Sequence, residues 1–205
     1  MPLVPDDVFE SEAWVRGFRW VAGLDEAGRG PLAGPVVASA VILPRRCRIE
    51  GIRDSKLLTQ RQRERTFVQI LNRAIGIGVG IVDAEVIDTV NILEAARLAM
   101  EQAVRQLLPQ PDYLILDAVG LPRLAIEQRI VIKADGLCVA VAAASIIAKV
   151  TRDRLMAEAH VRYPEYGFLQ HKGYGTAEHL RTLKRYGPCT LHRRSFLPIR
   201  KAAAR

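Results

Sequence analysis

The chain has few cysteines, and their spacing excludes two kinds of small stabilised scaffold. Cys47, Cys138 and Cys189 are widely separated, odd in number, and contain no C-x-x-C pair. Zinc knuckles and disulfide frameworks both need closely spaced or paired cysteines. We therefore expect neither, and a reducing, cytoplasmic location fits this cysteine usage best.

The sequence also lacks segments that would target a protein to a membrane or anchor it there. The first ten residues carry three acids and no basic flank, so they do not resemble a signal peptide. The longest apolar run, Leu137 to Ala148, contains Ser145 and is too short to span a bilayer. We expect no membrane partner.

Positive charge is in excess. The 205 residues include 30 lysines and arginines against 22 acids, a net charge of +8, and 49% of them are hydrophobic. A basic excess of this size favours a polyanionic partner, because phosphates release counterions when they are neutralised. With no internal repeat or linker, we expect one monomeric domain over 1–205. Residues 1–17 would be a loose lead-in with a helical turn, and 192–205 a basic, partly disordered tail.

Hydrophobic periodicity predicts an α/β protein. Strands are expected at 20–24, 34–43, 75–82, 112–116 and 129–133. Helices are expected after the N-caps Thr59, Asn91 and Thr176, and over about 138–159. Residues 163–175, which contain proline and several glycines, are expected to form a loop. The alternating glycines of 75–82 leave one strand face bare, so another element should pack very close to it.

Two adjacent carboxylates at the end of the first predicted strand are the most informative feature. Asp25 and Glu26 precede Arg29, which lies between Gly28 and Gly30. Paired acids beside an apolar strand repel each other unless a cation is bound, and Mg²⁺ prefers oxygen ligands. Glycines let a backbone approach a ligand, and an arginine between them suits a phosphate. A strand that ends in a polar turn explains these residues equally well when they are taken alone.

Further acids at predicted strand ends favour the metal interpretation. Asp117 directly follows the 112–116 strand and Asp135 follows the 129–133 strand. Ligands gather where strands of an α/β sheet end, so these two acids and the Asp25–Glu26 pair can meet. Two divalent ions about 4 Å apart would then activate water and stabilise a leaving oxygen. The four histidines lack ligand spacing, and we expect most of them on the surface or on helix faces.

Two features suggest contacts with a nucleic acid. Ser145 and Lys149 lie four residues apart on one helix face and would point a hydroxyl and an ammonium at a backbone, although a solvated lysine fits the spacing equally well. Tyr174 lies between two glycines, where its ring can stack on a sugar and its hydroxyl can reach a ribose 2′-OH. For Tyr174 we favour the functional role.

Together these motifs resemble bacterial ribonuclease HII over about residues 20–198. The segments that carry the resemblance, in order, are Asp25-Glu26-Ala27-Gly28-Arg29-Gly30, Asp54-Ser55-Lys56, 112–117, Lys133-Ala134-Asp135, 143–153, Lys172-Gly173-Tyr174-Gly175-Thr176 and His192-Arg193-Arg194-Ser195-Phe196.

The resemblance implies an RNase H-like fold: a central mixed β-sheet flanked by helices, with a helical C-terminal segment. It implies an endoribonuclease that cleaves RNA in RNA–DNA hybrids and nicks duplex DNA 5′ of embedded ribonucleotides, leaving a 5′-phosphate and a 3′-hydroxyl. Two Mn²⁺ or Mg²⁺ ions would be the cofactor. The implied roles are metal-binding catalytic acids (Asp25, Glu26, Asp117, Asp135), a loop that reads the 2′-OH and phosphate through its backbone (Gly28, Arg29, Gly30), a sensor of the RNA–DNA junction (Tyr174), and backbone contacts (Lys56, Ser145, Lys149).

Some departures from the family matter. The third acid is often followed by glycine in the family, whereas Ala118 follows Asp117 here, which we expect to be tolerated. The fourth acid is Asp and no large extension precedes Asp25, which argues against ribonuclease HIII. The tail at 200–205 shows no sliding-clamp-binding peptide, so we expect no clamp partner. Two alternatives remain: another RNase H-like nuclease such as a junction resolvase, and a non-catalytic nucleic-acid-binding module.

Overall fold

The computed structural model describes residues 4–203, so the first three residues of the lead-in and the last two of the tail lie outside it. The elements in chain order are α1 Val8–Val15, β1 Val21–Ala27, β2 Val36–Ile42, η1 Ser55–Leu57, α2 Gln60–Arg73, β3 Gly76–Val82, α3 Ala84–Val90, α4 Ile92–Arg105, β4 Tyr113–Asp117, β5 Glu127–Val131, η2 Ala134–Gly136, α5 Val139–Arg162, η3 Pro164–Tyr166, α6 Phe168–His171, α7 Ala177–Tyr186 and α8 Leu197–Ala203.

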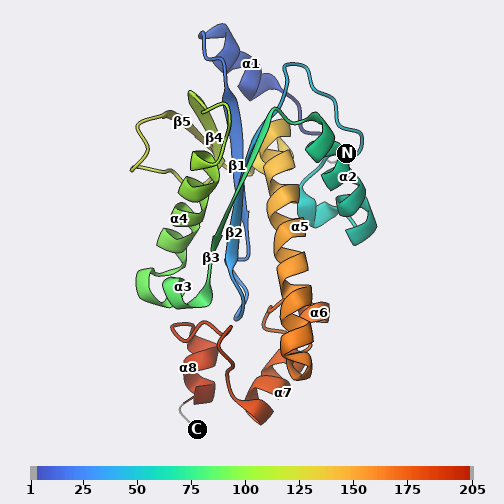
Figure 1. The fold of residues 1–205 in the computed structure, drawn as a ribbon, viewed down its shortest axis with the longest axis vertical. Helices are drawn as coiled ribbons and strands as arrows, with labels where there is room; N and C mark the ends of the chain where they lie inside the picture. Colours follow the sequence, from blue (N-terminus) through green and yellow to red (C-terminus); the bar gives the residue numbers. More distant parts are fainter. Residues whose placement is uncertain (1–3, 204–205) are drawn as a thin grey trace.

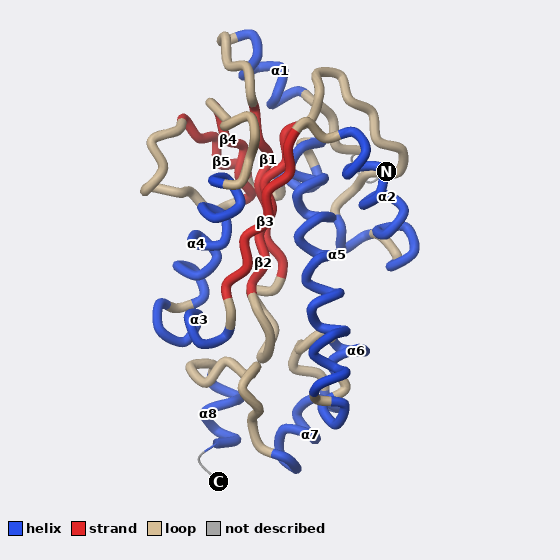
Figure 2. The backbone as a smooth tube through the Cα atoms, in the orientation of Figure 1, coloured by secondary structure: helices blue, strands red, loops and turns tan. Residues whose placement is uncertain are grey.

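A five-stranded mixed sheet forms the centre, in the order β3-β2-β1-β4-β5. β1, β2 and β3 pair antiparallel, whereas β1, β4 and β5 pair parallel. The long helix α5 lies along one side of the sheet and α3 and α4 lie on the other (Figure 1). Helices α6, α7 and α8 form the end of the molecule beyond the strands (Figure 2). The predicted mixed sheet flanked by helices is confirmed.

The alanine-rich first half of α5 packs directly on β1 and β2. Gly23 of β1 makes this approach possible, because a Cβ there would lie 2.3 Å from the backbone carbon of Ala140. Small residues on both elements therefore let helix and sheet pack backbone to backbone. The start of α5 is held by α1: buried Glu10 accepts a hydrogen bond from the Ala140 amide at 2.9 Å. The lead-in thus contains the expected helical turn and caps the central helix.

The glycines of β3 serve the opposite face of the sheet. Cβ atoms at Gly78 and Gly80 would lie 1.9 and 1.8 Å from the carbonyl oxygens of Ala103 and Ala99 in α4. The expected close packing against this strand is confirmed. The outer edge of β3 is also occupied, because Gln106, the C-cap residue of α4, both accepts from the Val79 amide and donates to its carbonyl, at 3.2 and 2.9 Å. Such side-chain pairing covers an edge strand that could otherwise pair with another chain.

The C-terminal segment differs from the partly disordered tail expected from the sequence. His192 and Arg193 are buried, and α8 follows them. Asp88 of α3 holds the segment by accepting hydrogen bonds from the amides of Arg194 and Ser195 at 2.7 and 2.9 Å. A distant carboxylate therefore supplies the order that the basic composition alone does not predict.

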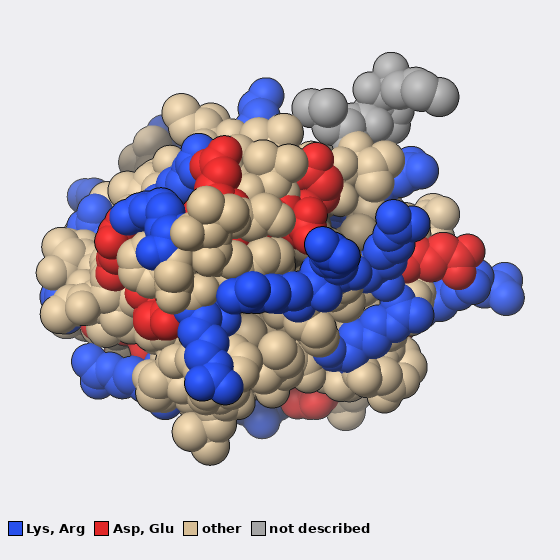
Figure 3. All heavy atoms as spheres, turned by 90° about the horizontal axis from the view of Figure 1, so that it is seen from above, with Lys and Arg blue, Asp and Glu red and all other residues tan. Residues whose placement is uncertain are grey.

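Charge is mixed at the end of the molecule where α1 lies. Seen from this end, lysine and arginine side chains are interleaved with acidic ones (Figure 3). Ion pairs between Arg16 and Glu127 and between Arg129 and Glu12 account for part of this pattern. Within residues 4–203 there is no helix with the length and apolar character needed to cross a membrane.

Replacing Gly78 by alanine tests the packing of α4 on β3. The added methyl group would meet the Ala103 carbonyl, so we expect the free energy of unfolding to fall by about 2–3 kcal/mol, as for other overpacked interiors. Chemical denaturation measures this change. The control is Gly136→Ala, where nothing lies within 4 Å of the added Cβ and the change should stay within about 0.5 kcal/mol. Equal stability of the two variants would contradict the packing.

Candidate active site

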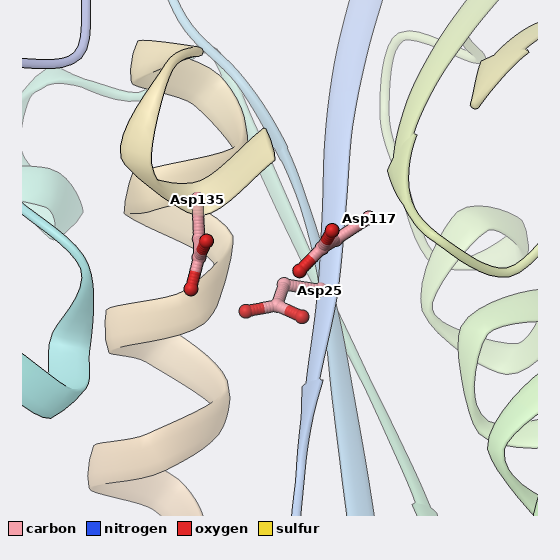
Figure 4. A group of neighbouring side chains, drawn as sticks. All are labelled: Asp25, Asp117 and Asp135. Carbon is pink, nitrogen blue, oxygen red and sulfur yellow. The ribbon is translucent and has the colours of Figure 1, made fainter. Parts of the chain in front are cut away.

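Three aspartates converge where β1 and β4 end. Leu24 of β1 pairs with Leu116 of β4 in parallel register, so Asp25 and Asp117, one residue further along each strand, emerge at the same level. Asp135 lies in η2, the turn that leads into α5. One carboxylate oxygen from each aspartate lies within 4.8 Å of the others, and the three side chains point toward a common centre (Figure 4).

The site concentrates negative charge in a buried place. Burial, and then the charge of Glu26, raise the pKa of Asp25 well above its ordinary value. Burial and the nearby Asp54 raise the pKa of Asp135 as well, against the opposing effect of Lys56. Carboxylates placed this close repel one another unless a cation lies between them. The oxygen-only donor set fits a hard divalent ion such as Mg²⁺ or Mn²⁺.

Glu26 lies at the edge of this cluster. Its Oε1 pairs with Arg29 Nη1 at 3.2 Å, and burial of the side chain raises the pKa of the carboxyl. Its other oxygen, Oε2, is buried and has no hydrogen-bond partner among the described residues. An unpaired buried carboxylate oxygen is costly, so it is available as a further ligand for a cation.

The residues expected to contact a nucleic-acid backbone occupy different environments. Lys56 has 73% of its side chain exposed, and its Nζ lies 3.4 Å from Asp135 Oδ2. Ser145 is buried and shares a 2.8 Å hydrogen bond with the Ser55 hydroxyl. The Nζ of Lys149 donates to Asp153 at 2.6 Å, with 19% of the lysine side chain exposed. Lys56 alone of the three presents a largely exposed cation.

The loop of residues 28–30 and the loop of residues 172–176 face each other next to the acids. A Cβ placed on Gly30 would lie 3.7 Å from Cε1 of Tyr174, whose side chain is half-exposed. Arg29 is exposed and connects the 28–30 loop to the cluster through Glu26. Gly28 has a φ of +100°, and a Cβ there would lie 2.2 Å from a side-chain nitrogen of Arg152. Only glycine fits this position.

A family model described as Ribonuclease HII matches residues 22–198. The chain belongs to the ribonuclease HII family. Curated ribonucleases HII from Acetivibrio thermocellus and Bacillus subtilis are 56% and 52% identical to it, over 189 and 191 residues. The first alignment covers 92% of this chain and 74% of the relative, and the second 93% and 74%. The expected resemblance is confirmed, and the chain is a metal-dependent ribonuclease.

Solved structures agree with this assignment. The ribonuclease H2 of Pyrococcus horikoshii OT3 has a TM-score of 0.77 at 30% identity, over 91% of this chain and 98% of that one. The RNase HII in a complex with PCNA from Archaeoglobus fulgidus has a TM-score of 0.74 at 27% identity, over 85% and 94%. The RNase H-like fold is confirmed. As an enzyme of this family, the chain is not the non-catalytic binding module kept as an alternative.

The residue after the third acid departs from the glycine that is frequent in the family. Ala118 has a φ of +56°, in the left-handed region, and its amide donates to the Val131 carbonyl at 3.2 Å. This conformation costs a residue with a Cβ about 1 kcal/mol. The sharp turn directs the chain out of β4 immediately after Asp117, which explains why glycine suits the position.

Three of the four histidines are buried, which differs from the surface positions expected for most of them, although two of the three lie in helices. His171, His179 and His192 are buried, with 8% exposure or less, and the rings of His171 and His179 stack 4.4 Å apart. His179 Nδ1 donates to the Tyr174 carbonyl at 2.9 Å, and its Nε2 accepts from His192 Nε2 at 3.0 Å. His192 Nδ1 in turn accepts from the Cys189 amide at 3.0 Å. The relay requires neutral rings and fixes the backbone at Tyr174.

The histidine relay predicts a pH-dependent contribution to stability. Burial, and then the neighbouring His179, lower the pKa of His192 to about 4 from an ordinary 6.5. Between these values the unfolded chain binds more protons than the folded one, so this contribution is complete above pH 6.5 and is lost as the pH falls toward 4. The loss amounts to about 3 kcal/mol.

Chemical denaturation at several pH values, in EDTA, measures this contribution as the difference in the free energy of unfolding between wild type and a His192 variant. Buried carboxylates with raised pKa values act in the opposite direction, so wild type is compared with His192→Gln. The stability of the variant should fall less than that of wild type between pH 6.5 and 4. His160→Gln, at a half-buried position with no part in the relay, is the control. Parallel curves for wild type and His192→Gln would contradict the relay.

Proposed function

We propose that this ribonuclease cleaves at ribonucleotides paired with DNA, both in RNA–DNA hybrids and where a single ribonucleotide is embedded in duplex DNA. The nick would lie 5′ of the ribonucleotide and leave a 5′-phosphate and a 3′-hydroxyl. This activity would remove ribonucleotides from DNA. The observation that carries the proposal is that the converging carboxylates lie next to a loop that packs close to Tyr174 and has two amides without an internal partner among the described residues.

The acids would hold a pair of Mg²⁺ or Mn²⁺ ions. Asp25, Asp117 and Asp135 offer converging oxygens, and the unpaired Oε2 of Glu26 offers a fourth. When bound, such ions lower the pKa of an attacking water and stabilise the oxygen that leaves the phosphorus. The Ala134 amide, which donates to Asp117 Oδ1 at 3.2 Å, keeps that carboxylate aimed at the centre.

Residues beside the acids would select the ribonucleotide. The amides of Arg29 and Gly30 make no internal hydrogen bond in the described part of the chain, so they can donate to a 2′-hydroxyl and its phosphate. The half-exposed ring of Tyr174 can stack on the sugar opposite them. The exposed ammonium of Lys56 can meet a phosphate. Ser145 and Lys149 remain predicted contacts, and both would need to exchange their present partners.

Asp117→Asn tests the role of the carboxylate cluster. Removing a metal ligand should lower the cleavage rate at least about a hundredfold, more than the loss of a group that only supports a ligand. Because the substitution relieves repulsion among buried carboxylates, the stability of the variant in EDTA should equal or exceed that of wild type. Cleavage of an end-labelled hybrid and thermal unfolding measure the two quantities.

The matched control is Asp7→Asn. Asp7 is the N-cap of α1 and its side chain makes no capping hydrogen bond. This variant should cleave at the wild-type rate. Turnover by Asp117→Asn at that same rate would remove the carboxylate cluster from the mechanism.

Tyr174→Ala tests how the substrate is selected. A single ribonucleotide in DNA offers one sugar to recognise, whereas a long hybrid offers many registers, so the variant should lose more kcat/KM on the first substrate. We expect a difference of about tenfold, the usual effect of one stacking contact. Equal losses on both substrates would show that Tyr174 only supports the loop.

A further inference from the structure

A buried arginine lies beneath the 28–30 loop and uses its whole guanidinium to hold it. Arg193 is fully buried, and its Nη1 donates to the carbonyls of Arg29 and Pro31 at 3.0 and 2.8 Å. Its Nη2 donates to the carbonyls of Gly28 and Gly34 at 2.6 and 2.9 Å, and Nε also reaches Gly34 at 3.0 Å. Four carbonyls of one short segment therefore point inward at a single side chain.

This arrangement dictates where the amides of the loop point. In a trans peptide the C=O and N–H bonds point in opposite directions, so a carbonyl turned inward turns the next amide outward. The amides of Arg29 and Gly30 follow two such carbonyls, and over residues 4–203 neither has a hydrogen-bond partner. Leu32 shows the same geometry: its amide points away from the guanidinium and donates to the Gly173 carbonyl at 2.8 Å.

A second buried arginine joins the segment that directly follows the 28–30 loop to the loop that carries Tyr174. Arg152 of α5 is 1% exposed and donates to the carbonyls of Ala33 and Pro35 at 3.1 and 2.9 Å. Its Nη1 donates to the Lys172 carbonyl at 3.0 Å, and its Cζ lies 6.0 Å from the centre of the Tyr174 ring. One guanidinium therefore hydrogen-bonds both the 33–35 segment, just after the 28–30 loop, and the loop that carries Tyr174.

Neither arginine makes an ion pair with a described carboxylate, which makes both costly to bury. Burial, and then the charge of Arg152, lower the pKa of Arg193 to about 9. Burying the charge of a lysine would be similarly costly, but a lysine could not replace the guanidinium, because its three donors radiate from one atom. The planar fork is what matches several carbonyls at once.

We propose that Arg193, assisted by Arg152, is a positioning residue that aims the Arg29 and Gly30 amides at the ribose and thereby sets the preference for ribonucleotides. The inference rests on the proposed function. The preference for ribonucleotides would then depend on side chains that do not touch the substrate, and it would be independent of the metal-binding acids.

Binding without cleavage tests the inference. In an Asp117→Asn background, affinity is measured for a DNA duplex with one ribonucleotide and for the same duplex in all-DNA form. Arg193→Lys should lower the preference for the first duplex about tenfold, the effect of losing a hydrogen bond to a well-aligned donor. Affinity for the all-DNA duplex should stay unchanged, as should the midpoint of a Mn²⁺ titration of an Arg193→Lys protein that retains Asp117. A merely structural role would weaken all three.

The control variant is Arg97→Lys. Arg97 of α4 donates to the Gly120 carbonyl at 3.2 Å, and 28% of its side chain is exposed. Arg97 touches neither the 28–30 loop nor the loop that carries Tyr174, so the preference of the Arg97→Lys variant for the ribonucleotide duplex should match that of the parent. An unchanged preference in Arg193→Lys, with a parent that does discriminate, overturns this inference alone. A parent that binds both duplexes equally overturns the proposed function and this inference together.

A second measurement needs no substitution at Arg193. In the NMR spectrum of the Asp117→Asn protein, the amide signals of Arg29 and Gly30 should shift on addition of the ribonucleotide duplex and much less with the all-DNA duplex. Equal shifts with both duplexes would show that these amides do not read the sugar, whatever the stability of the arginine variants.

Discussion

Mutual repulsion of buried carboxylates is the constraint on which the rest of the structure depends. The sheet brings Asp25 and Asp117 to one level because β1 and β4 run parallel, and η2 adds Asp135 before α5 begins. Burial makes this charge costly, and the described chain places only partial compensation nearby, at Lys56 and Arg29. The close packing of α5 on β1 opposes this repulsion, because it fixes the backbone on which Asp25 lies. A bound cation completes the site that the protein leaves with excess negative charge.

The opposite problem occurs a few residues away, where positive charge is buried. Arg193 and Arg152 are satisfied by backbone carbonyls in place of carboxylates, so their charges are not cancelled. The two groups are connected through the 26–29 stretch: Glu26 pairs with Arg29 Nη1 at 3.2 Å, and the Arg29 carbonyl accepts from Arg193 Nη1 at 3.0 Å. Under the proposed function, this stretch would join the metal-binding acids to the loop that contacts the ribose.

The acids and strands could be predicted from the sequence because their signals are local. Apolar runs end at Asp25 and Asp117, the bare face of β3 requires close packing, and the Thr59 capping box is present as expected. The supporting network could not be predicted in this way. Arg193 reaches the Gly28 carbonyl across 165 positions, and a backbone carbonyl has no sequence signature. The histidine relay and the docking of the tail by Asp88 also depend on contacts with backbone groups. For this reason the sequence alone indicated exposed histidines and a partly disordered tail, where the structure has buried histidines and an ordered segment.

The central claim is that acids and loop act together on a ribonucleotide within DNA. The most direct test uses one end-labelled DNA duplex that carries a single ribonucleotide, an all-DNA duplex as control, and Mn²⁺ or EDTA. The account predicts a nick immediately 5′ of the ribonucleotide with Mn²⁺, none with EDTA, and none in the control duplex. Cleavage of both duplexes would contradict recognition of the sugar, and cleavage in EDTA would contradict the role of the carboxylates.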